Sequence, residues 1–415
     1  MMGKVRRIYF SLLLLPITAA PALTQPKTRT EEIEQIRRDK MARLWPERQS
    51  PLVDEVNKLV ERGFLSGTES GKGANGWQVV LGGMRSGQGM SVGAGYRRSD
   101  FWRDRLDWRV TGRMTPELAT MVDFQLDFKS FRSERTFLTF YGKYENSPQM
   151  DYYGQGMSAS VDDRSSYRYE TMQFDFNAGL KIFKNFRIAI TGGVLGVHTG
   201  TGRRGGVPST DEIFDSTTAP GLGENTVFAR TGGFLIYDWR DYKQGPKAGG
   251  LYGLRWRLHS DRELFKYSFK QTELEFQQYI PYFNKTRTIA IRVASVLSFP
   301  TEGDAVPFYS QPTIGGNDDL RGFARYRYTD DHSIFVSVEH RWYAFSGLDM
   351  AVFIDGGKVV PRKKLIDPQK LKYSGGIGFR ARLANAVIMR VDMAYGDEGF
   401  RFMWTFSDIY KLRWW

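Results

Sequence analysis

The residues best suited to chemistry in this sequence are one arginine and two carboxylates that lie far apart along the chain. Arg321 lies in a turn-rich segment, and Glu339 and Asp355 lie in the two strand-like runs that follow it. A guanidinium is planar and has five hydrogen-bond donors, so in a poorly hydrated interior it needs carboxylates as partners. These residue types therefore predict a buried ion pair.

Glycines flank this arginine and let its segment reverse direction, because glycine adopts positive φ without steric cost. The motif residues of the segment are Gly315, Gly316, Arg321, Gly322 and Phe323. We predict that the segment 300–332 is a loop that folds back into the interior of a β-barrel. There Arg321 would bind Asp355 and Glu339. Desolvation offsets much of the attraction in such a pair, so its main effect would be to hold one loop conformation. The alternative is an exposed arginine in a flexible loop.

Catalytic and metal-binding chemistry is poorly represented. The chain has no cysteine, and its four histidines, His198, His259, His332 and His340, are scattered without metal-ligand spacing. There is no Gly-x-Ser-x-Gly nucleophile motif and no evident pair of catalytic acids. We predict no enzyme, no metal site and no cofactor.

The elements that carry the two carboxylates alternate with a period of two. In the run 333–344, Ile334, Val336 and Val338 share one face, while Glu339 and Arg341 share the other. Alternation of this kind is typical of a strand between an apolar and a polar environment. A cation that faces lipid costs about 2–4 kcal/mol at the middle of a bilayer. The charged face is therefore predicted to line the lumen of a membrane barrel.

The same alternation recurs in many runs. In the run 287–299, Ile289 and Arg292 point to opposite faces. In the run 386–395, Val387 and Met389 point to the face opposite that of Arg390. About sixteen such runs lie between Trp77 and the C-terminus. We predict an all-β fold: a transmembrane antiparallel β-barrel of about sixteen strands, with a short helical N-terminal leader.

The links between the runs alternate in length. The links after odd-numbered runs include every very long one, namely 145–166, 200–225, 300–332 and 356–371. The links after even-numbered runs are mostly short, such as 184–185 and 384–385. Outer-membrane barrels have short periplasmic turns and long outer loops, so this alternation favours a barrel over a soluble β-sandwich.

The N-terminus has the pattern of an export signal. Lys4, Arg6 and Arg7 precede an apolar run, and Ala20 and Ala22 offer a small-residue cleavage site. We predict a cleaved signal peptide at 1–22, with an uncleaved anchor as the alternative. Residues 23–76 are predicted to form two short helices and a linker, either as a periplasmic or lumen-plugging segment or as a loosely docked leader. The barrel would occupy 77–415 and lie in the bacterial outer membrane.

The formal net charge of +13 is spread along the chain. It suits contact with anionic lipid head groups of the outer membrane, or solvated turns and a charged lumen. No nucleic-acid-binding module is recognisable, and nucleic acid is not a predicted partner.

The segment around Arg321 resembles the sixth outer loop of the BamA/TamA outer-membrane protein superfamily, also called bacterial surface antigens. The matching elements are Ile314-Gly315-Gly316, Leu320-Arg321-Gly322-Phe323, the Glu339/Arg341 strand, the Phe353/Asp355/Gly357 strand and the glycine-rich run 373–380. Upstream, 237–250 resembles the Asp-x-Arg-Asp periplasmic turn of the family, and 152–156 is similar to a loop element of its shorter members. The resemblance covers the chain from Trp77 onward.

The resemblance implies a barrel, the same pairing of Arg321, and a role in assembly, insertion or translocation of proteins at the outer membrane. The best-studied members carry periplasmic POTRA domains, whereas this sequence has two short helices in that place. We therefore expect a short member without POTRA domains, whose partners include client outer-membrane proteins or a periplasmic partner.

The mechanism would use a weak seam between the first and the last strand. The first run contains Gly82 and Gly83, and internal glycines weaken strand pairing, although they also mark bulges. An open seam would offer its strand edge to a client. The alternatives are a channel or secretion pore gated by the loop 300–332, in which Arg292, Arg380, Arg382 and Arg390 would favour anions, or a surface-exposed structural barrel without insertase activity.

Overall fold

The computed structural model describes residues 29–44, 65–67, 75–82, 84–85, 89–102, 105–129, 133–345, 347–361, 371–383 and 386–406. The chain divides into two units, 1–48 and 49–415. The described part of the first unit is the helix α1 (Arg29–Leu44), which lies within the predicted helical leader. The predicted signal peptide, the second predicted helix and Gly83 lie outside the described residues. No described helix is long and apolar enough to cross a membrane.

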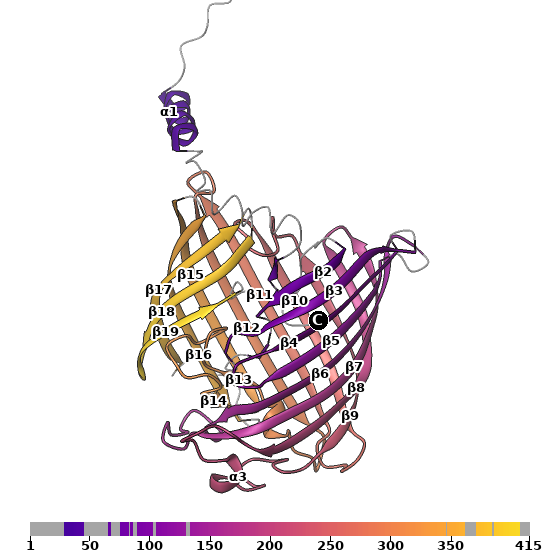
Figure 1. Cartoon of the computed structure of the whole chain (residues 1–415). Helices are drawn as coiled ribbons and strands as arrows, with labels where there is room; N and C mark the ends of the chain where they lie inside the picture. Colours follow the sequence, from indigo (N-terminus) through magenta and orange to yellow (C-terminus); the bar gives the residue numbers. More distant parts are fainter. Residues whose placement is uncertain are drawn as a thin grey trace, which may run out of the picture. The chain divides into compact units, whose positions relative to one another are not determined.

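The second unit is built almost entirely from strands (Figure 1). The first strands are β1 (Leu65–Gly67), β2 (Gly76–Leu81), β3 (Val92–Phe101), β4 (Leu106–Met114), β5 (Thr120–Phe128), β6 (Thr136–Tyr152), β7 (Ser165–Phe183) and β8 (Phe186–Thr201). They are followed by α3 (Thr210–Ile213), β9 (Thr226–Asp238), β10 (Gly249–Asp261), β11 (Phe269–Tyr282), β12 (Arg287–Pro300), η1 (Phe308–Ser310), β13 (Thr313–Ile314) and β14 (Tyr328–Thr329). The last strands are β15 (His332–Phe345), β16 (Leu348–Val360), β17 (Lys372–Leu383), β18 (Ala386–Gly396) and β19 (Gly399–Thr405).

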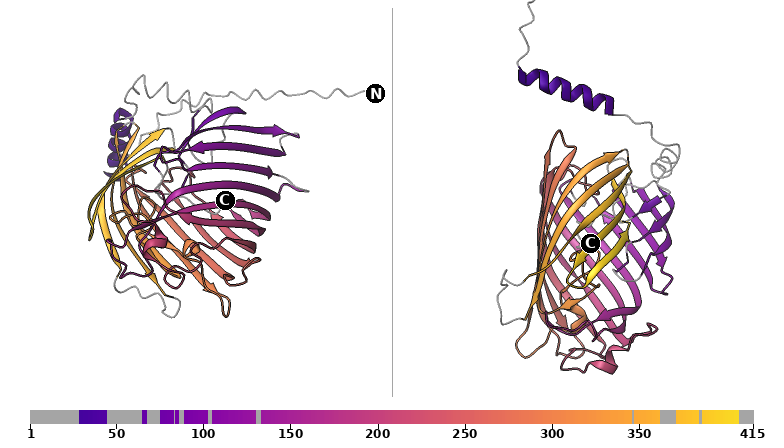
Figure 2. Two further views of the ribbon diagram at one scale, coloured as in Figure 1. Left: turned by 60° about the horizontal axis from the view of Figure 1, so that its bottom comes forward. Right: turned by 90° about the vertical axis from the view of Figure 1, so that its left-hand side faces the viewer.

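Sixteen strands, β2–β12 and β15–β19, form one antiparallel sheet in chain order, as the sequence predicted. The short β1 pairs with β2 in parallel, and β13 and β14 form a separate two-stranded sheet. The large sheet curls around an interior (Figure 2). Its terminal strands are β2 and β19, and the described residues form no ladder between them. The fold is that of a β-barrel.

The links of the barrel are sorted by length, which confirms the predicted alternation. One end, here called the loop end, has the links 153–164, 202–225, 301–331 and 361–371. The other, the turn end, has links such as 184–185 and 283–286. Two predicted links begin too early: β6 continues to Tyr152, so its link begins at 153 rather than 145, and β16 continues to Val360, so its link begins at 361 rather than 356. In β6 a register shift between Ser147 and Met150 carries the pairing with β7 past Pro148.

The two faces of the sheet differ as expected. Ile289 and Ile354 are exposed on the outside, whereas Arg292, Arg380 and Arg390 are buried inside. Val387 is an exception, because it is only 7% exposed. A register shift next to Arg382 pairs Val387 with Arg382 and Met389 with Ala381, so the alternation changes phase and turns Val387 inward.

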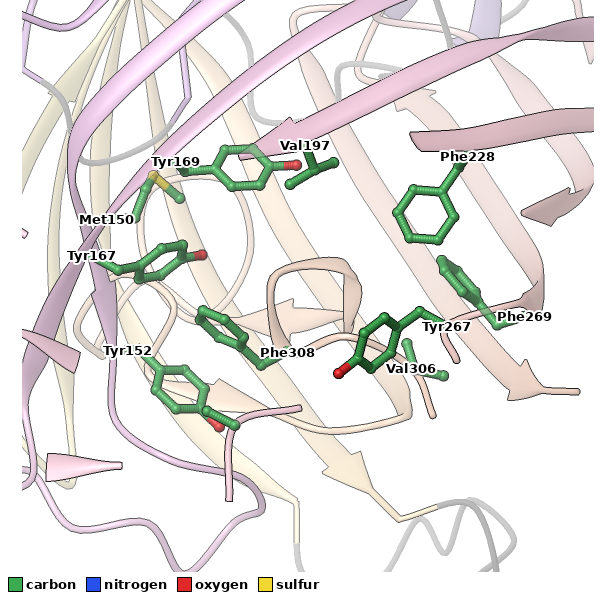
Figure 3. Close-up of a cluster of buried hydrophobic side chains, with 11 residues drawn as sticks. Met150, Tyr152, Tyr167, Tyr169, Val197, Phe228, Tyr267, Phe269, Val306 and Phe308 are labelled. Atoms are coloured by element: carbon green, nitrogen blue, oxygen red, sulfur yellow. The ribbon is translucent and has the colours of Figure 1, made fainter. Parts of the chain in front are cut away.

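The largest core cluster lies inside the loop end of the barrel (Figure 3). Phe308 of the link 301–331 packs edge-on against Tyr152 and Tyr167, with ring centroids 5.0 Å and 4.8 Å apart. Phe214 of the link 202–225 contacts Tyr152 from another side, at 5.0 Å. Aromatic contacts thereby join two links to the strands β6 and β7.

Candidate functional site

The link 301–331, hereafter the sixth loop, folds back into the barrel through a glycine turn. Gly315 and Gly316 have φ values of 119° and 108°, which only glycine adopts easily. A carboxylate oxygen of Asp319 accepts hydrogen bonds from the backbone N–H groups of Gly315 and Leu320, both at 2.7 Å. This turn presents the next residue, Arg321, to the interior.

Arg321 is completely buried and contacts both carboxylates named from the sequence. Its Nε and Nη2 donate to the two oxygens of Asp355, each at 2.7 Å. Its Nη1 donates to Glu339 Oε1 at 2.5 Å. Its Cζ lies 3.3 Å from the centroid of the Phe353 ring. The geometry brings the three residues together, while their role as a latch stays a prediction.

The ion pairs extend across four adjacent strands, β15–β18. Glu339 also accepts from Arg380 Nη2 at 3.1 Å and from Arg341 Nε at 2.7 Å. Asp392 binds Arg380 at 2.6 Å and lies 3.6 Å from Arg321 Nη1. Alternation had placed Arg380 and Arg390 on the lumen face but had not assigned them to this site, because their proximity depends on the register between strands.

Glycines in the neighbouring strands make room for this network. Gly378 lies opposite Asp392 in the ladder between β17 and β18. A Cβ on Gly378 would clash with the carboxylate of Asp392 and the guanidinium of Arg380. The glycine-rich character of β17 therefore has a local cause: two large charged side chains cross its inner face.

The remaining motif residues fix the loop against the barrel wall. A Cβ on Gly322 would lie 2.5 Å from Ser374 Cβ and 3.0 Å from the backbone nitrogen of Gly396. Phe323 is buried in a cluster with Leu320, Tyr328 and other apolar residues. Glycine at 322 thus allows the loop backbone to lie directly on β17 and β18.

The sixth loop also binds the link 153–164. Gln155 Nε2 donates to Asp330 Oδ1 at 2.9 Å, and Gly156 N–H donates to the carbonyl of Thr329 at 2.7 Å. Burial raises the pKa of the Asp330 carboxyl, and the hydrogen bond from Gln155 opposes that shift. Contacts to a second link give the sixth loop support that does not involve Arg321.

At the turn end, the link 239–248 reaches to distant strands. Arg382 donates to the carbonyl of Gly245 at 3.2 Å and pairs with Asp349 at 2.9 Å. The backbone N–H of Val387 donates to the carbonyl of Gln244 at 2.9 Å. This is the segment whose sequence resembles the Asp-x-Arg-Asp periplasmic turn of the family, and it contacts the inward-turned Val387.

The two terminal strands of the sheet meet near one of the predicted seam glycines. Gly82 follows β2 directly and has a φ of 70°. A Cβ built on it would lie 3.6 Å from Phe406 Cβ, immediately after β19. Gly82 therefore ends the first strand instead of lying within it. Opening of the seam stays a prediction.

Comparison with known proteins agrees with this architecture. Residues 76–408 match the Omp85 superfamily domain. The fold is similar to BamA from Haemophilus ducreyi lacking POTRA domains 1–3, with a TM-score of 0.59 and 17% identity over 89% of this chain and 81% of that one. It is also similar to CdiB from Escherichia coli, with a TM-score of 0.50 and 11% identity over 76% of this chain and 59% of that one. No curated protein matches the sequence.

At such low identities the likeness to solved structures concerns the fold alone. The match to the family domain covers most of the chain, including every strand of the sixteen-stranded sheet and the sixth loop. This chain therefore belongs to the Omp85 superfamily of outer-membrane β-barrel proteins.

Proposed function

We propose that this protein assembles, inserts or translocates other proteins at the bacterial outer membrane, with its sixth loop held inside the barrel by Arg321. The observation that supports this most directly is the fully buried Arg321, which contacts Asp355 and Glu339 inside an Omp85 barrel. BamA and CdiB are proteins of similar fold. The outer-membrane lipids would contact the exposed apolar face.

The route of a client is proposed to be the seam between β2 and β19. β2 has six residues and β19 has seven, whereas their successive neighbours β3 and β18 have ten and eleven. Among the described residues no ladder joins β2 to β19, so hydrogen bonds between strands do not hold these two edges together. A separated strand edge is a template for pairing with another chain.

The seam can be locked by a disulfide at the one place where its two sides are known to approach. A Cβ–Cβ distance of 3.6 Å between positions 82 and 406 falls within the range of native disulfides. The chain has no cysteine, so the double variant Gly82→Cys/Phe406→Cys forms one defined cross-link. We expect oxidised cells to lose other barrel proteins from the outer membrane and reduced cells to recover them.

The single variants Gly82→Cys and Phe406→Cys control for the strain of a side chain at positive φ. If the oxidised double variant supports normal levels of other barrel proteins while depletion of the protein lowers them, the seam is not the route. If depletion itself leaves those levels unchanged, the assembly function is wrong, and a structural or surface role is favoured.

A second candidate is a secretion pore that uses the lumen. A cavity of about 620 Å³ inside the barrel, lined by residues of the sixth loop and the wall, favours it. Planar-bilayer recordings separate the two candidates. A pore predicts that Arg321→Ala, by releasing the loop, raises the conductance, whereas a seam route predicts equal conductance in the variant and the parent protein.

A further inference from the structure

The lumen cavity has an excess of positive charge on its wall. Six cationic side chains line it: Arg85, Lys143, Arg230, Arg255, Arg257 and Arg325. The acidic side chains are fewer. Glu145, Asp175 and Asp318 line the cavity, and Glu273 pairs with Arg255 behind the lining. Two positive charges therefore remain without a negative counterpart.

The excess is concentrated at Arg257 on β10. Among the described residues, no carboxylate pairs with Arg257 and no hydrogen bond holds its guanidinium. The register explains why: the residues opposite Arg257 are Gly232 on β9 and Gln271 on β11. Neither neighbour carries a charge, so the guanidinium faces the cavity with its donors available.

Two more arginines that line the cavity, Arg230 and Arg255, already form ion pairs with carboxylates. Arg230 on β9 binds Asp175 at 2.5 Å, and its Nε has no hydrogen-bond partner. Arg255, two residues before Arg257 on the same face of β10, pairs with Glu273. These ion pairs hold both guanidinium groups in fixed positions beside the cavity, and Arg230 retains an unused donor.

His259 continues the same row and is the most informative member. It is 6% exposed, lines the cavity, and has no hydrogen-bond partner at either ring nitrogen. Its ring stacks on Phe269 at 4.4 Å and contacts the edge of Phe228; both phenylalanines appear in Figure 3. A buried polar group without a partner is costly, so this imidazole is positioned for a ligand.

The lumen arginines of β12, β17 and β18 differ from this group. Arg292 binds Glu275, Arg380 and Arg390 bind Asp392, and Arg382 binds Asp349. Each of these four arginines is paired with a carboxylate, so the four do not supply the free positive charge that the predicted preference for anions requires. The uncompensated charge of Arg257 lies on β10, which the sequence did not single out.

We propose that Arg257, Arg230 and His259 form a binding site for a phosphate group within the barrel lumen. A phosphate monoester carries a charge of about −1.5 to −2 at pH 7 and three strong acceptor oxygens. Arg257 supplies an uncompensated positive charge, and Arg230 and His259 add nitrogens without hydrogen-bond partners. Guanidinium groups recognise phosphate by paired hydrogen bonds. The cavity also has room for an organic group, beside Tyr169, Tyr309 and Phe269. The site is independent of the proposed role in protein assembly.

The test is isothermal titration calorimetry on the purified full-length protein folded in detergent. The probes are inorganic phosphate and glucosamine 1-phosphate, and N-acetylglucosamine without phosphate serves as the negative probe. We expect both phosphate probes to bind. Tighter binding of glucosamine 1-phosphate would assign the cavity to a phosphorylated sugar, and equal binding would assign it to the free anion.

Variants locate the site. Arg257→Gln is expected to weaken phosphate binding at least tenfold, and Arg257→Lys less, because lysine keeps the charge but loses the planar fork. Arg168→Gln is the matched control: Arg168 alternates with the inward-facing Tyr167 and Tyr169 and pairs with Glu170. His259→Gln provides a second, neutral change within the site. Absence of phosphate binding by the parent protein, or equal binding by Arg257→Gln and His259→Gln, would overturn the proposal.

Discussion

A completely buried guanidinium is stable only if its surroundings replace the water it has lost. Around Arg321 this is achieved by two oxygens of Asp355, one of Glu339 and the face of the Phe353 ring. Since desolvation offsets most of the attraction, the pair adds little to overall stability but strongly favours one arrangement over its alternatives. The proposed consequence is a sixth loop with a single conformation.

Removal of Arg321 tests this directly. Arg321→Ala leaves Asp355 buried with Ser337 as a hydrogen-bond partner, a change that costs about 3–5 kcal/mol in comparable buried pairs. We expect limited proteolysis to cut between 301 and 331 in the variant and not in the parent protein. The double variant Arg321→Ala/Asp355→Asn removes the stranded charge and should recover part of the stability without recovering protection of the loop. Unchanged protection in Arg321→Ala would contradict the latch.

Gly322 provides a purely steric test of the same contact. Gly322→Ala places a methyl group 2.5 Å from Ser374 Cβ, and overpacking of this kind typically costs about 1–3 kcal/mol. We expect faster proteolysis of the sixth loop, with the charges of the network intact. Gly205→Ala is the control, since a Cβ at that position meets nothing within 4 Å. Equal proteolysis rates in both variants would show that the loop does not need to lie on β17 and β18.

The sixth loop is attached to the barrel at two independent places. Its first half enters the aromatic cluster through Phe308, and its second half carries Arg321 and Phe323 into the β15–β18 network. Phe308 belongs to η1, and β13 lies between the two attachments. A segment held at both ends loses much less entropy when either contact forms, because the other has already restricted it.

This arrangement predicts a partial release. Phe308→Ala empties a buried aromatic position, which costs about 3–5 kcal/mol in protein cores. Hydrogen–deuterium exchange should increase in 301–312 and remain low around Arg321. Phe265→Ala removes an equally large ring that is 71% exposed and should leave exchange unchanged. If exchange rises equally over all of 301–331, the two attachments form one cooperative unit.

The barrel as a whole separates an apolar exterior from an ionic interior across a single layer of backbone. Ile354 is 56% exposed, while Asp355, the next residue, is fully buried. Successive side chains point to opposite faces of a strand, so a shift of one residue would turn every lumen charge toward lipid. The exterior has apolar side chains on strands all around the sheet, from Val122 on β5 to Phe402 on β19.

A single substitution on the outer face measures this environment. Ile354→Arg is expected to destabilise the barrel by about 2–4 kcal/mol if position 354 lies near the bilayer midplane, and by less near an interface. Urea-dependent folding into phospholipid vesicles, followed by tryptophan fluorescence, would measure the difference. Ile354→Ala controls for lost packing. An arginine variant as stable as the alanine variant would show that this face does not contact lipid.

Much of this architecture could be predicted from the order of residue types. Alternation in 287–299 correctly placed Ile289 outside and Arg292 inside, because the period of a strand is a local property of its backbone. The sorting of long and short links favoured a barrel, because short periplasmic turns alternate with long outer loops in outer-membrane barrels. The proximity of Arg321 to Glu339 and Asp355 was predictable because a buried cation requires carboxylate partners. Few carboxylates lie on the inner face of the two strands that follow Arg321.

The remaining features depend on which residues lie opposite one another, and this is set by register across the whole sheet. Val387 turns inward because of a register shift beside Arg382 that leaves no mark in its own sequence. The sequence does not distinguish Arg257 from the other lumen arginines. The register of the sheet does, because it places the uncharged Gly232 and Gln271 opposite Arg257. Alternation therefore determines the face on which a charge lies. Only the folded barrel determines whether that charge finds a partner, because the partner comes from a distant part of the chain.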